Sequence, residues 1–295
     1  MALLHVNDTS LPGTAQLAAT LAALPPAGPI VIMIHGFRFD PATRSHDPHH
    51  HILSLRPGQA CWKAVSWPRH LGLAGDRGLA IGFGWQARGT IWSAHARAAR
   101  AGARLARLID LLEQVAPERP VQIFAHSLGA RVALTALPRL SPGRVGRIVL
   151  IAAAAFAPET RRSLASPAGR TAEVFNVTAP ENTLFDLLLR AALPLRGRTL
   201  GAGLPGLPNW LDLPLADPAT LATLGRMGWR IRRPAARICH WSGYLRPGIF
   251  PLYRAILTAP RSTPQAVLRS HLDRPRDQTT ARSVLPLPFP PTAPL

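Results

Sequence analysis

The chain is poor in acidic residues and almost devoid of lysine. It has 15 Asp and Glu against 34 Lys and Arg in 295 residues, which gives a formal net charge of +19 at pH 7. Because Lys63 is the single lysine, arginine carries nearly all of this charge. A basic excess of this size admits nucleic acid, an anionic lipid surface or an acidic substrate as a partner, without choosing among them. The preference for arginine, beside abundant alanine, proline and glycine, is more typical of compositional bias than of a specific binding face.

Cysteine and long apolar runs are scarce as well. Cys61 and Cys239 lie far apart with no second cysteine nearby, which argues against a disulfide framework or a thiolate zinc site. The longest apolar run, residues 148–157, is much shorter than the roughly 20 residues that span a bilayer. The first ten residues have no basic segment followed by an apolar run. No secretory signal is therefore predicted, and the expected location is the cytoplasm.

Hydrophobic residues, at 47% of the chain, are sufficient for a packed core, and their pattern alternates between strands and helices. Pro29–Ile34 is a run of β-branched and apolar residues without polar alternation, as in a strand buried on both faces. Further strands are predicted at 2–6, 79–85, 121–125, 147–153, 173–177 and 237–240, and helices at 14–24, 94–115, 128–137 and 248–257. This alternation predicts an α/β fold with a mostly parallel central sheet flanked by helices.

Two segments interrupt the alternation. Residues 40–78 form a long connection rich in His and Pro, and residues 184–232 form a lid-like insertion before the expected last strand. We expect one domain over residues 1–282 that contains both insertions. Residues 283–295 are rich in proline and are predicted to be a disordered tail.

The most informative motif is Ala125-His126-Ser127-Leu128-Gly129, which lies where a buried strand meets a helix. That context is typical of a nucleophile elbow, a tight strand-turn-helix that raises a serine hydroxyl above the sheet edge. Small residues are needed two positions before and after the serine, and Ala125 and Gly129 meet that need. The alternative interpretation is a serine that merely caps the helix.

A second turn, His35-Gly36, follows the strand at 29–34. A glycine there lets the chain turn so that the N–H of Phe37 can face the serine. Together with the N–H of Leu128 at the helix start, it would form an oxyanion hole. A plain turn is the alternative.

A serine nucleophile needs a base, and the base needs an orienting group. After an elbow of this kind the acid comes next in the chain, and the histidine follows the last strand. His240 fits that position, and His271 is its rival. Glu181 is the favoured acid, because it lies where the chain leaves the strand at 173–177, and Asp186 and Glu159 remain alternatives.

These motifs together resemble the α/β-hydrolase superfamily, over most of the chain. The resemblance implies hydrolysis through an acyl-enzyme, with neither a metal nor an organic cofactor. The chain departs from the common pattern in having Ala125 in place of glycine and a glutamate as the favoured acid.

The resulting hypothesis is a serine hydrolase that cleaves a carboxylic ester, with lipid esters and thioesters among the candidates. Ser127, His240 and Glu181 would form the triad. The alternatives are a non-catalytic binding protein of the same fold and a basic protein that binds anionic surfaces. The His-rich run at 46–51 has no spacing suited to one metal ion, and no nucleic-acid-binding module accompanies the arginines at 97–107. Weak association with anionic membranes is compatible with the charge, whereas acyl transfer and the oligomeric state stay open.

Overall fold

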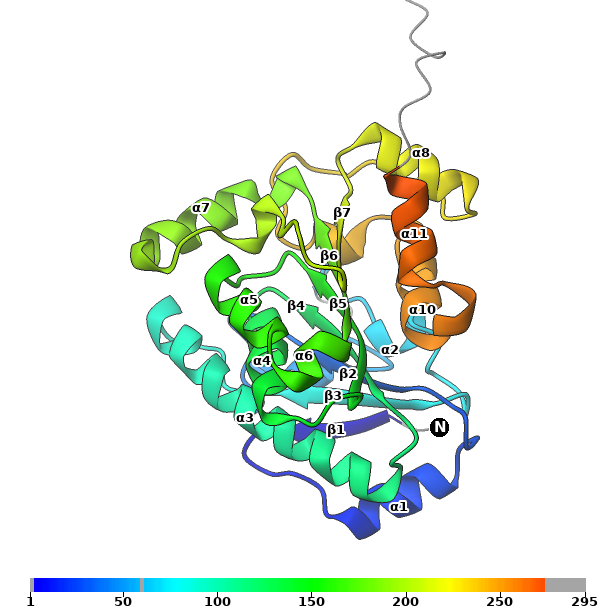
Figure 1. Ribbon diagram of the computed structural model, residues 1–295. Coiled ribbons are helices and arrows are strands. Elements are labelled where there is room, and N and C mark those ends of the chain that lie inside the picture. Colours follow the sequence, from blue (N-terminus) through cyan, green and yellow to red (C-terminus); the bar gives the residue numbers. More distant parts are fainter. Residues whose placement is uncertain (1–2, 59–60, 274–295) are drawn as a thin grey trace, which may run out of the picture.

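Seven parallel strands form one sheet in the computed structural model, which describes residues 3–58 and 61–273 (Figure 1). The strands are β1 (Leu3–Asn7), β2 (Ile30–Ile34), β3 (Leu79–Gly84), β4 (Val121–His126), β5 (Val145–Ile151), β6 (Glu173–Thr178) and β7 (Trp210–Pro214). Their order across the sheet is β1-β3-β2-β4-β5-β6-β7, and every neighbouring pair is parallel.

Both faces of the sheet are covered, which explains the unbroken apolar runs. In β2 every residue is buried, with Ile30 and Ile32 in the core on one face and Val31 and Met33 in the core on the other. Successive side chains of a strand point to opposite faces, so a strand between two helical layers must be apolar at every position.

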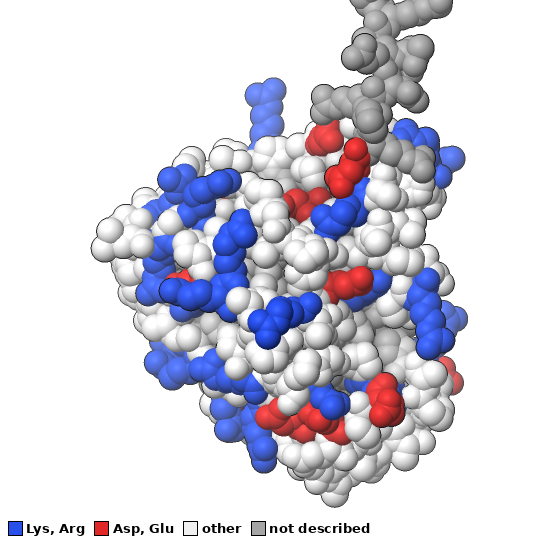
Figure 2. Space-filling view, in the orientation of Figure 1, with Lys and Arg blue, Asp and Glu red and all other residues white. Residues whose placement is uncertain are grey.

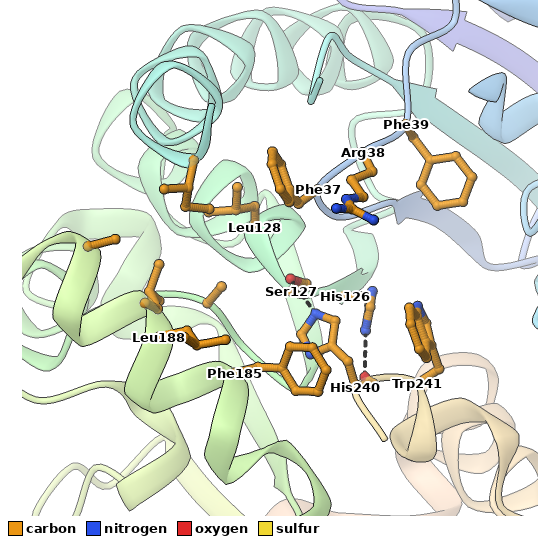
Figure 3. Close-up of a pocket in the computed structure, with 14 residues that line it drawn as sticks. Phe37, Arg38, Phe39, His126, Ser127, Leu128, Phe185, Leu188, His240 and Trp241 are labelled. Atoms are coloured by element: carbon orange, nitrogen blue, oxygen red, sulfur yellow. Dashed lines mark hydrogen bonds between the residues drawn. The ribbon is translucent and has the colours of Figure 1, made fainter. Parts of the chain in front are cut away.

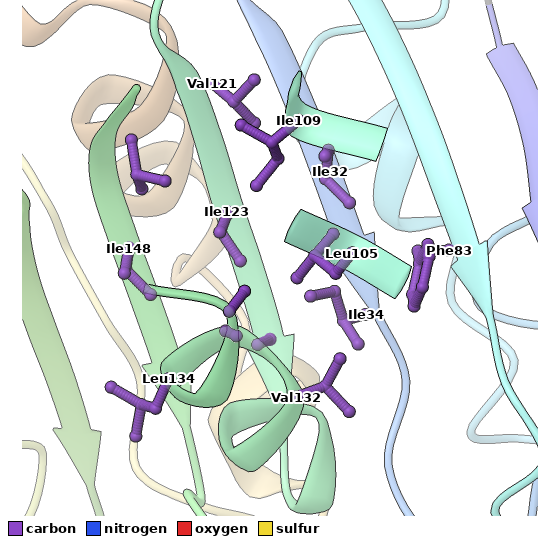
Figure 4. Packing of buried hydrophobic residues seen from close by; sticks show 14 of the residues in the cluster. Ile32, Ile34, Phe83, Leu105, Ile109, Val121, Ile123, Val132, Leu134 and Ile148 are labelled. Atoms are coloured by element: carbon purple, nitrogen blue, oxygen red, sulfur yellow. The ribbon is translucent and has the colours of Figure 1, made fainter. Parts of the chain in front are cut away.

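The helices divide between these two faces (Figure 1). One layer consists of α1 (Thr14–Ala22), α3 (Ile91–Val115), α4 (Leu128–Ala136), α5 (Ala157–Leu164) and α6 (Pro167–Thr171). The other consists of α2 (Trp67–His70), α8 (Pro218–Arg226), α9 (Ser242–Leu245), α10 (Phe250–Thr258) and α11 (Gln265–Leu272). Another helix, α7 (Thr183–Ala192), begins beyond the carboxyl end of β6. Figure 4 shows how α3 and α4 pack on β2, β4 and β5, with Leu105 and Val132 against Ile34 and Ile123.

The strand order places a switch point at β2. The chain passes from β2 to β3 on one side and then crosses to β4 on the other side. In open α/β sheets, ligands bind in the crevice that such a reversal leaves at the carboxyl ends of the strands. The two turns singled out in the sequence, after β2 and after β4, both lie at this crevice.

The predicted fold class is confirmed, and one predicted strand is wrong. Residues 237–240 form a loop, and the last strand of the sheet is instead β7, inside the segment predicted as an insertion. Four prolines and three glycines around β7 make this sequence resemble a loop, although Trp210, Leu211 and Leu213 supply the buried positions. The Pro-rich stretch 283–295 lies outside the described residues. No helix in the described part of the chain is long and apolar enough to cross a membrane.

Candidate active site

Ser127 lies in the sharp turn between β4 and α4. Its backbone has φ 55° and ψ −124°, a conformation that L-residues rarely adopt. Its hydroxyl does not cap the helix, because it makes no hydrogen bond to the backbone of the first turn of α4. A serine in this backbone conformation, between a buried strand and a helix at the carboxyl edge of a parallel sheet, has the geometry of a nucleophile elbow.

Two glycines allow the backbones around this turn to approach closely. A Cβ at Gly36 would lie 2.6 Å from the Cβ of Ser127, and one at Gly129 would lie 2.6 Å from the carbonyl oxygens of Ile34 and His35. Contacts below 3.0 Å force something to move, so both positions require glycine. The turn after β2 is thereby pressed against the serine. The parallel sheet, its strand order and the turn at Ser127 are those of the α/β-hydrolase fold.

Comparisons with known proteins find only distant likeness to solved structures. No protein-family model and no curated protein matches the sequence. Similar solved structures include MenH from S. aureus, a Trichoderma reesei cutinase in complex with a C11Y4 phosphonate inhibitor, and the carboxylesterase CesB (YbfK) from Bacillus subtilis. Their identities are 10%, 14% and 10%, and their TM-scores are 0.32, 0.28 and 0.30. The alignments cover 63%, 54% and 65% of this chain and 84%, 68% and 77% of those chains. Likeness this distant carries no information on activity or substrate.

The imidazole of His240 meets the serine hydroxyl. Its Nε2 lies 2.8 Å from the Oγ of Ser127, although the two residues are far apart in the sequence (Figure 3). The main-chain oxygen of His240 lies 3.0 Å from the Nε2 of His126, and the ring of Phe185 packs 4.6 Å from the imidazole, centre to centre. Burial, with a smaller contribution from the charge of His126, holds the pKa of His240 well below its usual value. The imidazole is therefore neutral at pH 7, as a general base must be.

The other imidazole nitrogen is bound by an amide rather than by a carboxylate. The Nδ1 of His240 lies 2.6 Å from the Oδ1 of Asn182, which can only accept, so Nδ1 carries the proton and Nε2 is free to accept from Ser127. The Nδ2 of Asn182 in turn donates to Asp186 at 3.1 Å. Ser127, His240, Asn182 and Asp186 thus form one continuous chain of hydrogen bonds.

Glu181, the acid favoured from the sequence, is directed away from this chain. Both of its carboxylate oxygens accept hydrogen bonds from Arg246, at 2.7 and 2.9 Å, and both side chains are almost fully buried. Its main-chain oxygen accepts from the N–H of Cys239, the residue before His240. Glu181 occupies a 3₁₀ turn, η4 (Pro180–Asn182), in which adjacent side chains diverge. The residue next to it, and not Glu181 itself, reaches the histidine.

The remaining candidates lie elsewhere or act indirectly. The carboxylate of Glu159 is held by Arg131 and Arg196, and its pKa is lowered although burial alone would raise it. His271 belongs to α11, which packs against α8 at the far side of the sheet from α4. Asp186 reaches His240 only through Asn182. Burial raises the pKa of Asp186 to about 6, against a smaller lowering by the hydrogen bond from Asn182.

Asn182 is the residue that sequence reasoning missed. The search after β6 considered carboxylates alone, and Asn182 lies directly beside the favoured one. An amide oxygen can accept the same Nδ1–H bond, so widening the search to all acceptors in this loop would have included it.

Two residues that line the cavity, Phe37 and Leu128, have backbone N–H groups without a hydrogen-bond acceptor within the described residues. The turn that presents Phe37 is fixed by His35, whose Nε2 accepts from the N–H of Trp85 at 3.0 Å and whose carbonyl accepts from the indole of Trp85. Burial lowers the pKa of His35 to about 3, so its imidazole is neutral and serves to hold this turn in place.

A cavity of about 400 Å³ opens above the serine (Figure 3). Most of its wall is apolar, and the charged residue on it is Arg38. It is lined by Phe37, Arg38, Phe39, Ile91, His126, Ser127, Leu128, Ala154, Phe185, Leu188, Leu189, Ala192, His240 and Trp241.

The His-rich run at 46–51 takes no part in lining this cavity. His49 bonds to Asn7 and stacks on His5, and His50 pairs with Asp47. Among residues 3–58 and 61–273, no group of three His, Cys, Asp or Glu side chains is arranged to hold a metal ion.

Proposed function

We propose that the protein is a serine hydrolase that cleaves carboxylic esters through an acyl-enzyme. The observation that carries this proposal is the hydrogen-bonded series from Ser127 through His240 to Asn182, whose first two members line an apolar cavity. A serine hydroxyl, a neutral base with a fixed tautomer and a site for an acyl group are the three requirements of acyl transfer.

In the first step Ser127 attacks the carbonyl carbon of the ester. Its proton passes to Nε2 of His240, and the new carbon–oxygen bond leaves a negative charge on the carbonyl oxygen. The Oδ1 of Asn182 keeps the imidazole in place and accepts from Nδ1–H throughout. The imidazole can therefore take the proton from Ser127 as a base and later give it up as an acid without rotating.

The N–H groups of Phe37 and Leu128 are the donors for the oxyanion. Both residues line the cavity, and Leu128 is the first residue of α4, where the helix dipole favours negative charge. Donors placed in advance at such a position contribute about 3–4 kcal/mol each in the transition state.

The tetrahedral intermediate then collapses. His240 gives its proton to the departing alcohol oxygen, the ester bond breaks, and the acyl group remains on Ser127. A water molecule attacks the acyl carbon while His240 takes its proton, and the second collapse releases the carboxylic acid and restores the serine. The apolar wall formed by Phe185, Leu188 and Leu189 is suited to an aliphatic acyl chain.

A fluorophosphonate probe tests the nucleophile. The wild-type protein should be labelled and Ser127→Ala should not, because the probe reacts with an activated serine. Ser270→Ala, which removes an exposed serine on α11, is the matched control and should be labelled like wild type. A folded wild-type protein that is not labelled would overturn the proposal and favour a non-catalytic binding protein of this fold.

A series of p-nitrophenyl esters tests the substrate class. We expect kcat/KM to rise as the acyl chain lengthens and fills the cavity, and then to level off. Equal values for acetate and octanoate would contradict an apolar acyl site.

A further inference from the structure

Helix α7 has three different sides. At 100° per residue, Phe185, Leu188, Leu189 and Ala192 fall on one side, which lines the cavity. Leu184, Leu187 and Leu188 fall on the adjacent side, which is exposed. Asp186 and Arg190 fall on the third. The helix is thus apolar over more than half of its circumference, although only part of that surface is covered by the protein.

Exposed apolar side chains are concentrated around this helix and the cavity mouth. The described residues leave eight large hydrophobic side chains exposed. Four of them are Leu184, Leu187, Leu188 and Leu195, and a fifth, Trp92, donates its indole N–H to the carbonyl of Ala192. Trp62 packs on Trp241 of the cavity wall, and Ile238 comes two residues before His240. We call these seven residues the mouth face.

Scattered exposed leucines are ordinary, but a cluster of this kind marks an interaction site. Leu195 is 99% exposed and Leu188 58%. Of the eight exposed side chains only Val267, on α11, lies away from the mouth face.

Cations lie beside the mouth face, and the neighbouring carboxylates are bonded within the protein. Figure 2 shows Lys and Arg gathered on the side of the molecule where α7 lies. Arg38 and Arg190 are exposed there, and Lys63 lies 3.5 Å from the ring centre of Trp241. The neighbouring acids are bonded within the protein, Glu181 to Arg246, Asp186 to Asn182, and Glu159 to Arg131 and Arg196.

We propose that the mouth face docks on an anionic lipid bilayer, with α7 lying along the surface and the cavity opening toward the lipid. Leucine and tryptophan side chains would enter the interface while arginines contact the headgroups. A second copy of this chain is a less favourable occupant, because a symmetric contact would bring the same cations face to face. If the proposed function holds, the substrate is an ester drawn from the lipid phase; this part of the inference rests on that function. Docking itself needs no catalysis.

Sedimentation with vesicles tests the docking. Ser127→Ala protein is used as the background, so that no lipid ester is hydrolysed, with phosphatidylcholine vesicles and with vesicles containing 30 mol% phosphatidylglycerol. We expect binding to the anionic vesicles that weakens as NaCl is raised from 50 to 500 mM. Equal binding to both vesicle types, or none to either, would overturn the proposal.

Variants locate the surface. Leu184→Gln with Leu187→Gln should lower the vesicle partition coefficient about tenfold or more, because two apolar side chains no longer enter the interface. Arg190→Gln should lower it about fivefold. Val267→Gln and Arg261→Gln are the matched exposed controls and should bind like the background protein. Unchanged vesicle binding by the double leucine variant would overturn the proposal. It would also be overturned if the background protein did not bind vesicles but formed a dimer that the two leucine substitutions dissociate.

Activity separates the two proposals. With Ser127 restored, the double leucine variant should hydrolyse a soluble short-chain ester at the wild-type rate and a vesicle-embedded ester more slowly. Vesicle binding without hydrolysis of any ester would leave docking in place and remove the proposed function. Equal loss on both esters would show damage to the cavity and overturn the role given to the exposed leucines.

Discussion

At the scale of single residues, an amide stands where a carboxylate was expected. Asn182 accepts the Nδ1–H of His240 at 2.6 Å but brings no negative charge to the imidazole. The charge lies one hydrogen bond further away, on Asp186. Because Asp186 accepts from the NH₂ end of Asn182, it also fixes which end of the amide faces the histidine. Orientation and charge, combined in one side chain in an ordinary triad, are divided here between two.

Removing the amide should reduce the rate of chemistry. We expect Asn182→Ala to lower kcat on p-nitrophenyl esters by about 10²- to 10⁴-fold, because the imidazole loses its fixed tautomer and orientation. KM should change little, since Asn182 does not line the cavity. Steady-state kinetics measures both, with Thr183→Ala as the exposed neighbouring control. A KM increase with an unchanged kcat would contradict the orienting role.

The pKa of Asp186 predicts a pH-dependent stability difference. Since its pKa is raised to about 6 in the folded protein, folding favours the protonated form. The stabilisation is complete below the ordinary pKa of an unfolded aspartate and is lost as the pH rises through about 6. We therefore expect the Tm of Asp186→Asn, relative to wild type, to be higher at pH 8 than at pH 4.5. Thermal unfolding at a series of pH values tests this, and a constant difference would refute it. Asp76→Asn is an exposed control.

At the scale of elements, the candidate active site is built on two loops that lie beside a buried ion pair. The turn η4 carries Asn182, and the loop before α9 carries His240. The N–H of Cys239 donates to the carbonyl of Glu181 and joins the two loops, and the side chain of Glu181 pairs with Arg246 at the end of α9. Glu181 is thus a positioning residue for the loop pair.

Breaking this pair should destabilise the protein strongly. We expect Arg246→Met to lower the free energy of unfolding by about 3–5 kcal/mol, because Glu181 would be left buried without its partner. Replacing both residues by leucine should cost less than Arg246→Met alone. Urea unfolding measures the three proteins, and equal stability of Arg246→Met and wild type would refute the role of the pair. Arg261→Met, at an exposed position, is the control.

Local patterns revealed most of the sheet, and long-range pairing determined the rest. Strands such as β2 and β4 are readable because every position is apolar, and the elbow at Ser127 is readable because strand, turn and helix are consecutive. The edge strand β7 was not predicted, because prolines and glycines flank it. Residues 237–240 were predicted as a strand from their composition, but they have no neighbouring strand to pair with.

The third member of the site could not be read from the sequence. Which side chain of the loop after β6 meets His240 depends on the turn of η4 and on the partner of Glu181, Arg246. Arg246 lies 65 positions away in the chain, so no local pattern contains this information.

At the scale of the whole molecule, the charge of +19 is unbalanced. Self-repulsion among like charges weakens the compact state and is screened by salt. We expect the Tm to rise as NaCl increases from 10 to 300 mM. Scanning calorimetry measures this, with sucrose at the same osmolality as the control for solvent exclusion. A falling Tm would mean that partly exposed ion pairs such as Arg144–Glu113, which salt also screens, outweigh the repulsion.

The backbone conformation of Ser127 lowers the stability of the fold. A non-glycine residue at φ 55° and ψ −124° raises the free energy of the fold by about 1–3 kcal/mol. Glycine would adopt the same angles without that strain, at a cost of about 0.5–1 kcal/mol in chain entropy. Glycine at this position would therefore make the fold as stable or more stable, so the stability of the fold gives no reason for a serine here.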